Sequence, residues 1–285
     1  MKQRLLLWLL LTSPLPRCGQ TSDVPFVGCP SDGQIGPLSA PKGKAQQIQI
    51  APEAAGRLAW YKAKNAPGVL APRNWHCFGT YGSSGATLYV SPEPINSKLL
   101  FSSEWKGFRG PAIEISSMNG GTSGRFEVAQ KIARLFPAHI DFVRQVIAEG
   151  IEPASDFPSG PYPKDKLTYL TRTLVSFETP ALSKGLGTDS RLQPNEQAIQ
   201  GFVFLSMQPN DDAYDISLAI RTPQTSARSP KLLRRALSEI SRCFHRKLDI
   251  YTPHSRFQSV LSLRNWQRLD RQMYYHWLVM FFSIS

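Results

Sequence analysis

The sequence predicts an α+β fold, with a mostly antiparallel sheet, about three packed helices and a basic helical C-terminal extension. Runs rich in aromatic and β-branched residues flank short turns, and they do not alternate regularly with helical segments. The 285 residues, of which 41% are hydrophobic, suffice for a large core. Most of the net charge of +12 lies after position 227. We therefore predict a signal peptide (1–20), an α+β domain (21–225) and a basic amphipathic helical tail (226–285).

The N-terminus has the pattern of an export signal. Lys2 and Arg4 precede an apolar run at positions 5–11, and the turn formers Pro14 and Pro16 follow it. A positive start, a short apolar run and a break are typical of a secretory signal, and so short a run cannot cross a bilayer. We expect an exported protein, periplasmic or secreted, with envelope association as an option. A lipid-anchored N-terminus and a buried first helix remain alternatives.

The cysteines occupy positions 18, 29, 77 and 243. In an exported domain Cys18 leaves with the signal, so Cys29 and Cys77 form the natural disulfide and Cys243 is left over. This bridge closes a loop of about 48 residues and stabilises the fold by roughly 3 to 4 kcal/mol. It also pins an extended arm, residues 19–44, which is rich in Pro, Gly and Ser.

The first half of the domain combines strands with one helix. An alternating strand at 46–50 precedes a helix expected over 52–64, which begins with a proline. A β-hairpin follows, because the β-rich runs 75–81 and 86–90 are joined by a Gly-Ser-Ser-Gly turn. A further strand is predicted at 111–118.

The second half of the domain begins with two helices, at 125–136 and 138–149, which a proline separates. In each of them the apolar residues share one helical face. Residues 166–178 alternate like a strand, and the run 199–207 is expected to pair with 214–221 across a polar turn.

One enzymatic hypothesis is a serine hydrolase that uses Ser83 or Ser84, with His76 or His139 as the base. The turn around the two serines comes close to the G-x-S-x-G elbow of hydrolases, but alanine replaces the last glycine, and a strand follows where the elbow requires a helix. A plain hairpin turn explains the same residues. The hydrolase is therefore the alternative to a non-enzymatic role.

The glycine-rich turn before the helix at 125–136 is a candidate anion-binding site. Its amides, the hydroxyls of Thr122 and Ser123 and the guanidinium of Arg125 can converge on a phosphate or carboxylate, aided by the helix dipole. The turn lacks the lysine and the spacing of a P-loop. A strand-to-helix turn that needs glycines for backbone reasons alone is the competing interpretation.

No metal site and no cofactor are predicted. The sequence contains no C-x-x-C, H-x-x-x-H or H-E-x-x-H spacing. Cys243 and His245 together supply at most two of the three or four ligands that zinc requires.

The tail contains a basic amphipathic segment. Arg264, Arg268 and Arg271 fall on one side of the predicted helix, and Trp266 and Trp277 fall on the other. Such a helix can neutralise lipid headgroups and insert its aromatic side chains, which makes an anionic membrane surface a candidate partner. Packing of the helix on the sheet is the alternative. No nucleic-acid motif is present, so nucleic acid is not expected as a partner.

Three long phrases of the domain carry a family resemblance. They read RLAWYKAKNAPGVLAPRNWHCFGTYGSSGATLYV, TSGRFEVAQKIARLFP and IAEGIEPASDFPSGPYPKDKLTY. Over roughly residues 26–223 the chain resembles an uncharacterised family of exported proteobacterial proteins. The resemblance implies export and nothing about mechanism. The sequence thus favours an exported, non-enzymatic binding or structural protein of unknown partner, with a periplasmic serine hydrolase and a membrane-surface protein as alternatives.

Overall fold

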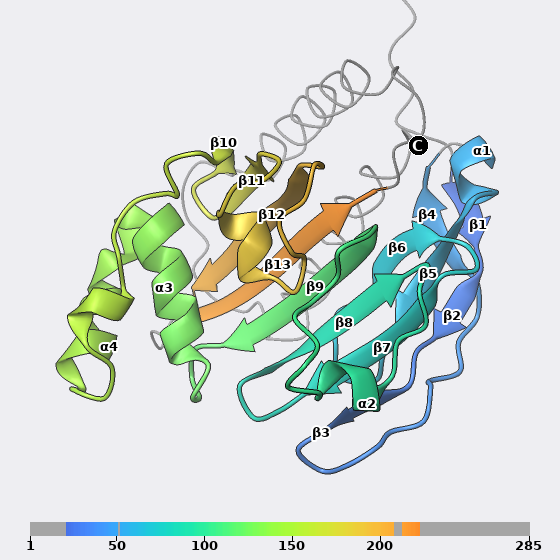
Figure 1. Cartoon of the computed structure of the whole chain (residues 1–285), viewed down its shortest axis with the longest axis horizontal. Helices are drawn as coiled ribbons and strands as arrows, with labels where there is room; N and C mark the ends of the chain where they lie inside the picture. The colour runs from blue at the N-terminus through green and yellow to red at the C-terminus, as the bar shows by residue number, and fades with distance from the viewer. Residues whose placement is uncertain (1–20, 51, 208–212, 223–285) are drawn as a thin grey trace, which may run out of the picture.

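A computed structural model of the chain describes residues 21–50, 52–207 and 213–222. Its centre is an eight-stranded sheet in the order β10-β11-β12-β13-β9-β8-β7-β3 (Figure 1). All neighbouring strands are antiparallel except β3 and β7, which are parallel. The strands of this sheet are β3 (Ser31–Gly33), β7 (His76–Tyr81), β8 (Gly85–Ser91), β9 (Ala112–Asn119), β10 (Lys166–Thr171), β11 (Leu174–Thr179), β12 (Ile199–Met207) and β13 (Ala213–Arg221).

Two smaller sheets are built from the N-terminal part of the chain. Strand β2 pairs in parallel with β5, which pairs antiparallel with β6, and β1 pairs antiparallel with β4. In Figure 1 these strands lie at the side of the molecule opposite α3 and α4. Their bounds are β1 (Thr21–Val24), β2 (Phe26–Gly28), β4 (Gln46–Gln49), β5 (Leu58–Lys62) and β6 (Val69–Pro72).

The prediction of a helix over 52–64 is correct for the first turn only and wrong for the rest. The structure has a short helix α1 (Pro52–Ala55) and then the strand β5. Leu58, Ala59, Trp60 and Tyr61 are all buried, so successive side chains point into apolar surroundings on both sides of the strand. A helix would have turned part of this continuous apolar run toward water.

The helices expected after β9 are confirmed. Helix α3 (Arg125–Leu135) and helix α4 (Ile140–Ala148) are separated by the 3-10 turn η1 (Pro137–His139). The proline fits at the start of that turn because its missing N–H would have had no intrahelical acceptor there. Shorter helical segments are α2 (Ser97–Leu100), η2 (Ala154–Asp156) and η3 (Leu186–Asp189). No helix within the described ranges is long and apolar enough to cross a membrane.

The expected strands are confirmed with one difference. The hairpin β7–β8, the strand β9 and the pair β12–β13 lie where the sequence pattern places them. The single strand expected at 166–178 is instead a hairpin of β10 and β11. The Thr171 hydroxyl accepts a hydrogen bond from the backbone N–H of Thr173 (3.2 Å), and this local bond helps the chain to turn between the two strands.

The large sheet has a hydrophobic core on each face. One core joins the sheet to the two small sheets, and the other joins it to the helices α3 and α4. The described residues thus form a sheet-rich α+β structure with largely antiparallel strands, as predicted. The helical extension expected at 226–285 lies outside them.

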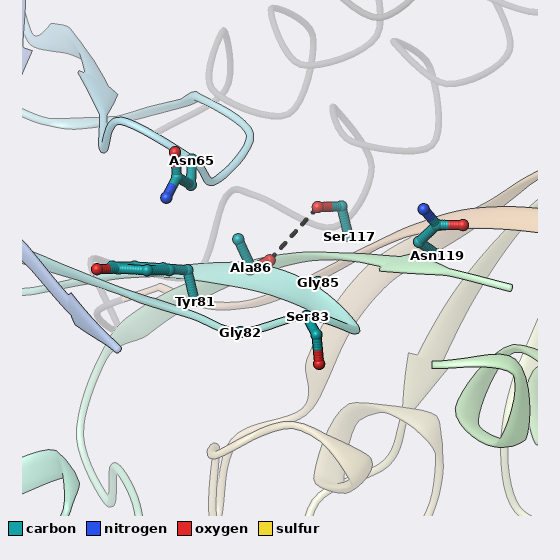
Figure 2. Close-up of a pocket in the computed structure, with 8 residues that line it drawn as sticks. All are labelled: Asn65, Tyr81, Gly82, Ser83, Gly85, Ala86, Ser117 and Asn119. Carbon is teal, nitrogen blue, oxygen red and sulfur yellow. Dashed lines mark hydrogen bonds between the residues drawn. The ribbon is translucent and has the colours of Figure 1, made fainter. Parts of the chain in front are cut away.

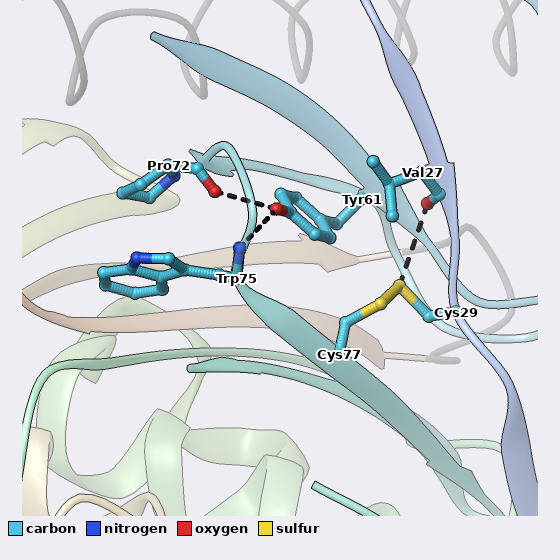
Figure 3. The surroundings of a disulfide bond; sticks show 6 residues. All are labelled: Val27, Cys29, Tyr61, Pro72, Trp75 and Cys77. Atoms are coloured by element: carbon cyan, nitrogen blue, oxygen red, sulfur yellow. Dashed lines mark hydrogen bonds between the residues drawn. A yellow bond between two sulfur atoms is a disulfide. The ribbon is translucent and has the colours of Figure 1, made fainter. Parts of the chain in front are cut away.

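The predicted disulfide between Cys29 and Cys77 is confirmed. The two sulfur atoms are 2.09 Å apart, and Cys29 is fully buried (Figure 3). Cys29 lies between β2, which belongs to a small sheet, and β3, which belongs to the large one. The bond therefore fastens the N-terminal arm at the point where it passes from one sheet to the other.

A hydrogen-bonded tyrosine organises the loop beside the disulfide. The buried Tyr61 hydroxyl donates to the carbonyl of Pro72 (2.8 Å) and accepts the backbone N–H of Trp75 (3.1 Å), as Figure 3 shows. Burial raises the pKa of Tyr61, and the hydrogen bond from Trp75 opposes this shift. The loop between β6 and β7 is thereby held against β5, just before the chain reaches Cys77.

Candidate functional site

The face of the sheet that carries α3 has a polar centre. Thr80, Thr87, Ser116 and Ser217 lie opposite one another on the successive strands β7, β8, β9 and β13. Their side chains share one face of the sheet, because directly paired residues point to the same side. We call these four residues the hydroxyl row.

A cavity of about 70 Å³ lies beside the hydroxyl row, between the sheet, α3 and η3. We call it the polar chamber. At about 30 Å³ of liquid per water molecule, its volume corresponds to roughly two waters. Its polar lining residues are Glu114, Ser116, Lys131, Asp189, Ser190 and Ser217. Its apolar lining comes from β11, β12, β13 and η3, so the polar groups are set in apolar surroundings.

A buried ion pair borders the polar chamber. The Lys131 Nζ lies 2.6 Å from Asp215 Oδ1, and the hydroxyl of Ser217 donates to the same oxygen (3.1 Å). The Asp215 side chain is 1% exposed, and its Oδ2 has no hydrogen-bond partner among the residues described. Burial raises the pKa of the Asp215 carboxyl, and Lys131 opposes this shift. Asp215 Oδ2 therefore keeps an unused acceptor in a place from which water is largely excluded.

Glu114 is the second carboxylate at this site. Its Oε2 accepts the backbone N–H of Arg191 (2.6 Å), and its side chain lies opposite Tyr89 on β8. Burial raises the pKa of the Glu114 carboxyl to about 7, although the hydrogen bond from Arg191 and the charge of Lys131 oppose this shift. A carboxyl group with such a pKa exchanges a proton readily near neutral pH.

The phenol of Tyr89 shares the environment of Glu114. Burial and the charge of Glu114 raise the pKa of Tyr89 to about 12, and hydrogen bonds with Thr80 and Thr87 oppose the shift. The tyrosine therefore stays protonated at neutral pH and connects the carboxylate with the hydroxyl row.

The third carboxylate, Asp189, is held from outside the polar chamber. Its Oδ1 accepts the Tyr162 hydroxyl (2.7 Å), and the Arg134 guanidinium carbon lies 3.8 Å from the centre of the Tyr162 ring. Burial raises the pKa of the Asp189 carboxyl, while the Tyr162 hydrogen bond and Arg134 lower it. The tyrosine and the arginine thus fix the position of the chamber wall that η3 provides.

A second cavity lies on the opposite face of the sheet. Ser117 follows Ser116 in β9, so the two side chains point to opposite faces. The second cavity has a volume of about 230 Å³ and lies between the β7–β8 hairpin, the end of β9 and the loop after β5 (Figure 2). We call it the hairpin cleft. Its lining residues are Asn65, Tyr81, Gly82, Ser83, Gly85, Ala86, Ser117 and Asn119.

The residues of the hydrolase hypothesis are not brought together. His76 begins β7, whereas Ser83 and Ser84 follow its last residue, so a strand of about 17 Å separates them at about 3.3 Å per residue. Ser84 lies beside Gly124 at the start of α3, and His139 follows the other end of this helix, about 16 Å away at 1.5 Å per residue. Neither histidine is within hydrogen-bond reach of the serines.

The donors of the predicted anion site are engaged in other bonds. The Arg125 guanidinium donates to both carboxylate oxygens of Glu149, with its Nη2 2.6 Å from Oε2, and this partner raises the pKa of Arg125. The Thr122 hydroxyl donates to the carbonyl of Asn119 (2.9 Å). Ser123 lies in the same turn. An anion would have to compete with Glu149 for Arg125, so the anion site stays a prediction.

The predicted membrane contact lies outside the described residues. The membrane-contact residues Arg264, Trp266, Arg268, Arg271 and Trp277 belong to the part of the chain that the structure does not describe. Within the described ranges, no group of three or more His, Cys, Asp or Glu side chains is placed to hold a metal ion.

Comparison of the chain with protein families, with curated proteins and with solved structures finds no match.

The polar chamber was not predicted, although its residues left a signal in the sequence. In AIEIS and DISLA, the polar side chains alternate with apolar ones along β9 and β13. Such alternation normally marks a strand with one face in water. The pattern does not reveal that α3 covers the polar face, because that contact joins segments far apart in the chain.

Proposed function

We propose that the protein is an exported, non-enzymatic binding protein, and that the polar chamber receives the polar end of its ligand. The observation that carries this proposal is the position of the Lys131–Asp215 pair and of Glu114 between α3 and the sheet, where Asp215 is buried and Lys131 and Glu114 are half-buried. Apolar side chains of similar volume would stabilise the fold as well or better. Buried ionisable groups with shifted pKa values concentrate at functional sites.

The chemistry of the polar chamber suits a ligand group that donates hydrogen bonds. Glu114 and Asp189 line the chamber with carboxylates. Beside the lining, Asp215 contacts Lys131 and Ser217, and its Oδ2 has no partner among the described residues. A terminal ammonium or hydroxyl group is small enough for the volume of about 70 Å³ and can bond to these oxygens. The remainder of the ligand would extend toward solvent.

Binding is tested by thermal unfolding with small compounds that carry such groups, namely ethanolamine, ethylenediamine and glycerol. We expect at least one of them to raise the melting temperature of the wild type and to have less effect on Glu114→Gln. The matched control is Glu104→Gln, which removes the same charge from an exposed position and should respond like the wild type. An equal response of all three proteins would contradict binding in the polar chamber.

Export is supported by the disulfide between Cys29 and Cys77. Disulfides persist in oxidising compartments and are rare in the reducing cytosol. Mass spectrometry of the native protein is expected to show loss of about the first 20 residues, as for a cleaved signal, and a mass consistent with oxidised Cys29 and Cys77. Recovery of both thiols free, with the N-terminus intact, would contradict export.

A serine hydrolase has less support, because Ser83 and Ser84 are far from His76 and His139. A fluorophosphonate probe separates the two hypotheses. The binding protein should remain unlabelled, whereas a hydrolase should be labelled at one serine. Labelling at Ser83 or Ser84 that requires one of the histidines would favour the hydrolase.

The membrane-surface alternative depends on the tail. It predicts that the chain co-sediments with anionic liposomes, that salt weakens the association and that removal of residues 255–285 abolishes it. Co-sedimentation that persists after the truncation would rule out the tail as the membrane contact.

A further inference from the structure

The hairpin cleft is a second candidate site, separated from the polar chamber by the thickness of the sheet. Three segments that are distant in sequence form it: the loop after β5 contributes Asn65, the β7–β8 hairpin contributes Tyr81 and Ala86, and β9 contributes Ser117 and Asn119. Figure 2 shows Asn65 on the side of the cleft that faces Ala86 and Ser117 across it. A ligand in this cleft would contact both the loop and the sheet.

The lining of the hairpin cleft is polar but uncharged among the described residues. It offers the amides of Asn65 and Asn119 and the hydroxyl of Ser117, and each of these groups can donate as well as accept. A lining without charge has no preference for an anion or a cation. It fits a neutral ligand that both donates and accepts hydrogen bonds.

These three groups keep hydrogen-bonding capacity for a ligand. Asn119 uses its Oδ1 to accept the backbone N–H of Gly121 (2.9 Å), and its NH₂ group donates to none of the residues that the structure describes. The exposed Asn65 amide makes no hydrogen bond within the part of the chain that the structure describes. The Ser117 hydroxyl makes one long bond to the carbonyl of Ala86 (3.5 Å). A ligand can therefore bind here without breaking strong protein hydrogen bonds.

Tyr81 gives the hairpin cleft an aromatic surface in a fixed position. Its hydroxyl donates to the carbonyl of Gly36, which anchors the ring at its far end. Figure 2 shows the ring edge-on, with one of its faces directed to the side on which Asn65 lies. The face of an aromatic ring is negative and attracts the weakly positive C–H groups of a ligand.

The floor beside Tyr81 consists of residues with little or no side chain. Gly82, Gly85 and Ala86 lie there, and a Cβ atom added to Gly82 would meet nothing within 4 Å. A flat ligand can therefore approach the ring and the strand closely. The volume of about 230 Å³ corresponds to seven or eight waters at about 30 Å³ each, which matches one sugar ring better than a longer chain.

We propose that the hairpin cleft binds one ring of a neutral saccharide. The C–H face of the sugar packs on Tyr81, while its hydroxyls bond to the amides of Asn65 and Asn119 and to the hydroxyl of Ser117. An aromatic surface flanked by a few polar groups is the arrangement that orients a small ligand in a pocket. This site is additional to the polar chamber and does not depend on it.

Saccharide binding is measured by saturation-transfer NMR and calorimetry on the full, disulfide-bonded chain. The neutral probes are methyl glucoside, methyl galactoside and N-acetylglucosamine, and the charged comparators are glucuronate and glucosamine. We expect saturable binding of at least one neutral sugar and weaker binding of both comparators. Absence of binding by all three neutral sugars, or tighter binding of a charged comparator, would overturn the proposal.

A variant in the hairpin cleft and a control outside it localise the bound sugar. Asn65→Ala alters an exposed loop residue and should weaken binding about tenfold, the effect of losing one or two hydrogen bonds. Ser103→Ala is the control, because Ser103 is exposed and does not line the hairpin cleft. Its affinity should equal that of the wild type. Equal binding by the wild type and Asn65→Ala would overturn the proposal.

Glu114→Gln separates this proposal from the polar chamber. Glu114 belongs to the other face of the sheet, so this variant should bind the sugar with the affinity of the wild type. Loss of sugar binding in Glu114→Gln, with binding retained in Asn65→Ala, would place the sugar in the polar chamber and overturn the assignment to the hairpin cleft.

Discussion

The two faces of strands β8, β9 and β13 bury different kinds of side chain. Toward the small sheets they present Leu88, Val90, Ile113, Ile115, Ile216 and Leu218. Toward α3 the same strands present Thr87, Tyr89, Glu114, Ser116, Asp215 and Ser217. Both faces are covered, but only one of them is apolar at its centre. The apolar face contributes to stability through burial alone, whereas the polar face also holds ionisable groups that burial makes costly.

The apolar face is also the one that is fastened covalently. Cys29 belongs to the core between the sheet and the N-terminal strands, and its bond to Cys77 holds these strands on β7. The polar face has no such bond among the described residues, and it is closed by α3, α4 and η3. The disulfide resists separation of the N-terminal layer, whereas the described part of the α3 layer is held by non-covalent contacts.

The largest effect is expected from removing the disulfide that joins the N-terminal strands to β7. Replacing both cysteines, Cys29→Ala with Cys77→Ala, should lower the free energy of unfolding by roughly 3 to 4 kcal/mol, because the unfolded chain regains the freedom of a 48-residue loop. Urea denaturation measures the change. A reducing agent should lower the stability of the wild type similarly and leave the double variant unaffected. A loss below about 1 kcal/mol would show that packing alone holds this layer.

The second prediction concerns the stability that the protein loses when Glu114 ionises on the polar face. The pKa of Glu114 is raised from 4.5 to about 7 in the folded protein. The folded state therefore holds this proton more tightly than the unfolded state. Its stabilising contribution is complete below about pH 4.5 and is lost as the pH rises through about 7. At 1.36 kcal/mol per unit of pKa, the loss is on the order of 3 kcal/mol.

Comparison of two glutamate variants measures this cost. When the pH rises from 4.5 to 8, the free energy of unfolding of the wild type should fall further than that of Glu114→Gln, because glutamine does not ionise. The difference should be on the order of 3 kcal/mol. Glu104→Gln should follow the wild type. Asp189 and Asp215 contribute to the pH dependence of all three proteins and cancel in the comparison. Parallel pH profiles of the wild type and Glu114→Gln would show that Glu114 is well solvated.

The third prediction separates a structural polar group from the groups of the polar chamber. Arg221 is 1% exposed, and its guanidinium donates to the backbone carbonyls of Phe108, Arg109, Gly110 and Gln193. Burial lowers the pKa of Arg221. The arginine therefore ties two loops to the end of β13.

Lysine at this position cannot reproduce the planar set of donors. We expect Arg221→Lys to lower the free energy of unfolding by about 1 to 3 kcal/mol, because several buried carbonyls lose their donor. The exposed Arg172→Lys is the control and should change little. An unchanged stability of Arg221→Lys would mean that water replaces the guanidinium.

Local patterns predicted much of the fold. The helices α3 and α4, the hairpin β7–β8 and the pair β12–β13 follow from periodicity and turn residues that lie close together in the sequence. The disulfide followed from the cysteine positions and the expected compartment. Strand β5 was missed because it is an apolar run that is buried on both sides. Such a run shows neither the helical period of about 3.6 residues nor the alternation of a strand with one face in water.

The polar chamber depends on contacts that no local pattern contains. Lys131 looks like a surface residue of an amphipathic helix, and Asp215 looks like a residue on the wet face of a strand. They meet across 84 positions of sequence when α3 packs on the sheet. Burial of Asp215 is a property of that packing, so the shifted pKa of Asp215 could not be derived from the sequence.

The smallest expected effect compares two neighbours on β9. Ile115 points into the apolar core and is fully buried, whereas Ser116 points toward the polar chamber. Ile115→Val removes one buried methyl group and should cost about 0.5 to 1.5 kcal/mol. Ser116→Ala removes a hydroxyl that belongs to the hydroxyl row, and the free energy of unfolding should stay within about 0.5 kcal/mol of the wild type. Urea denaturation of both variants in one buffer measures the difference. If Ser116→Ala lowered the free energy of unfolding as much as Ile115→Val, the hydroxyl row would stabilise the fold. The proposed difference between the two faces of the sheet would then be wrong.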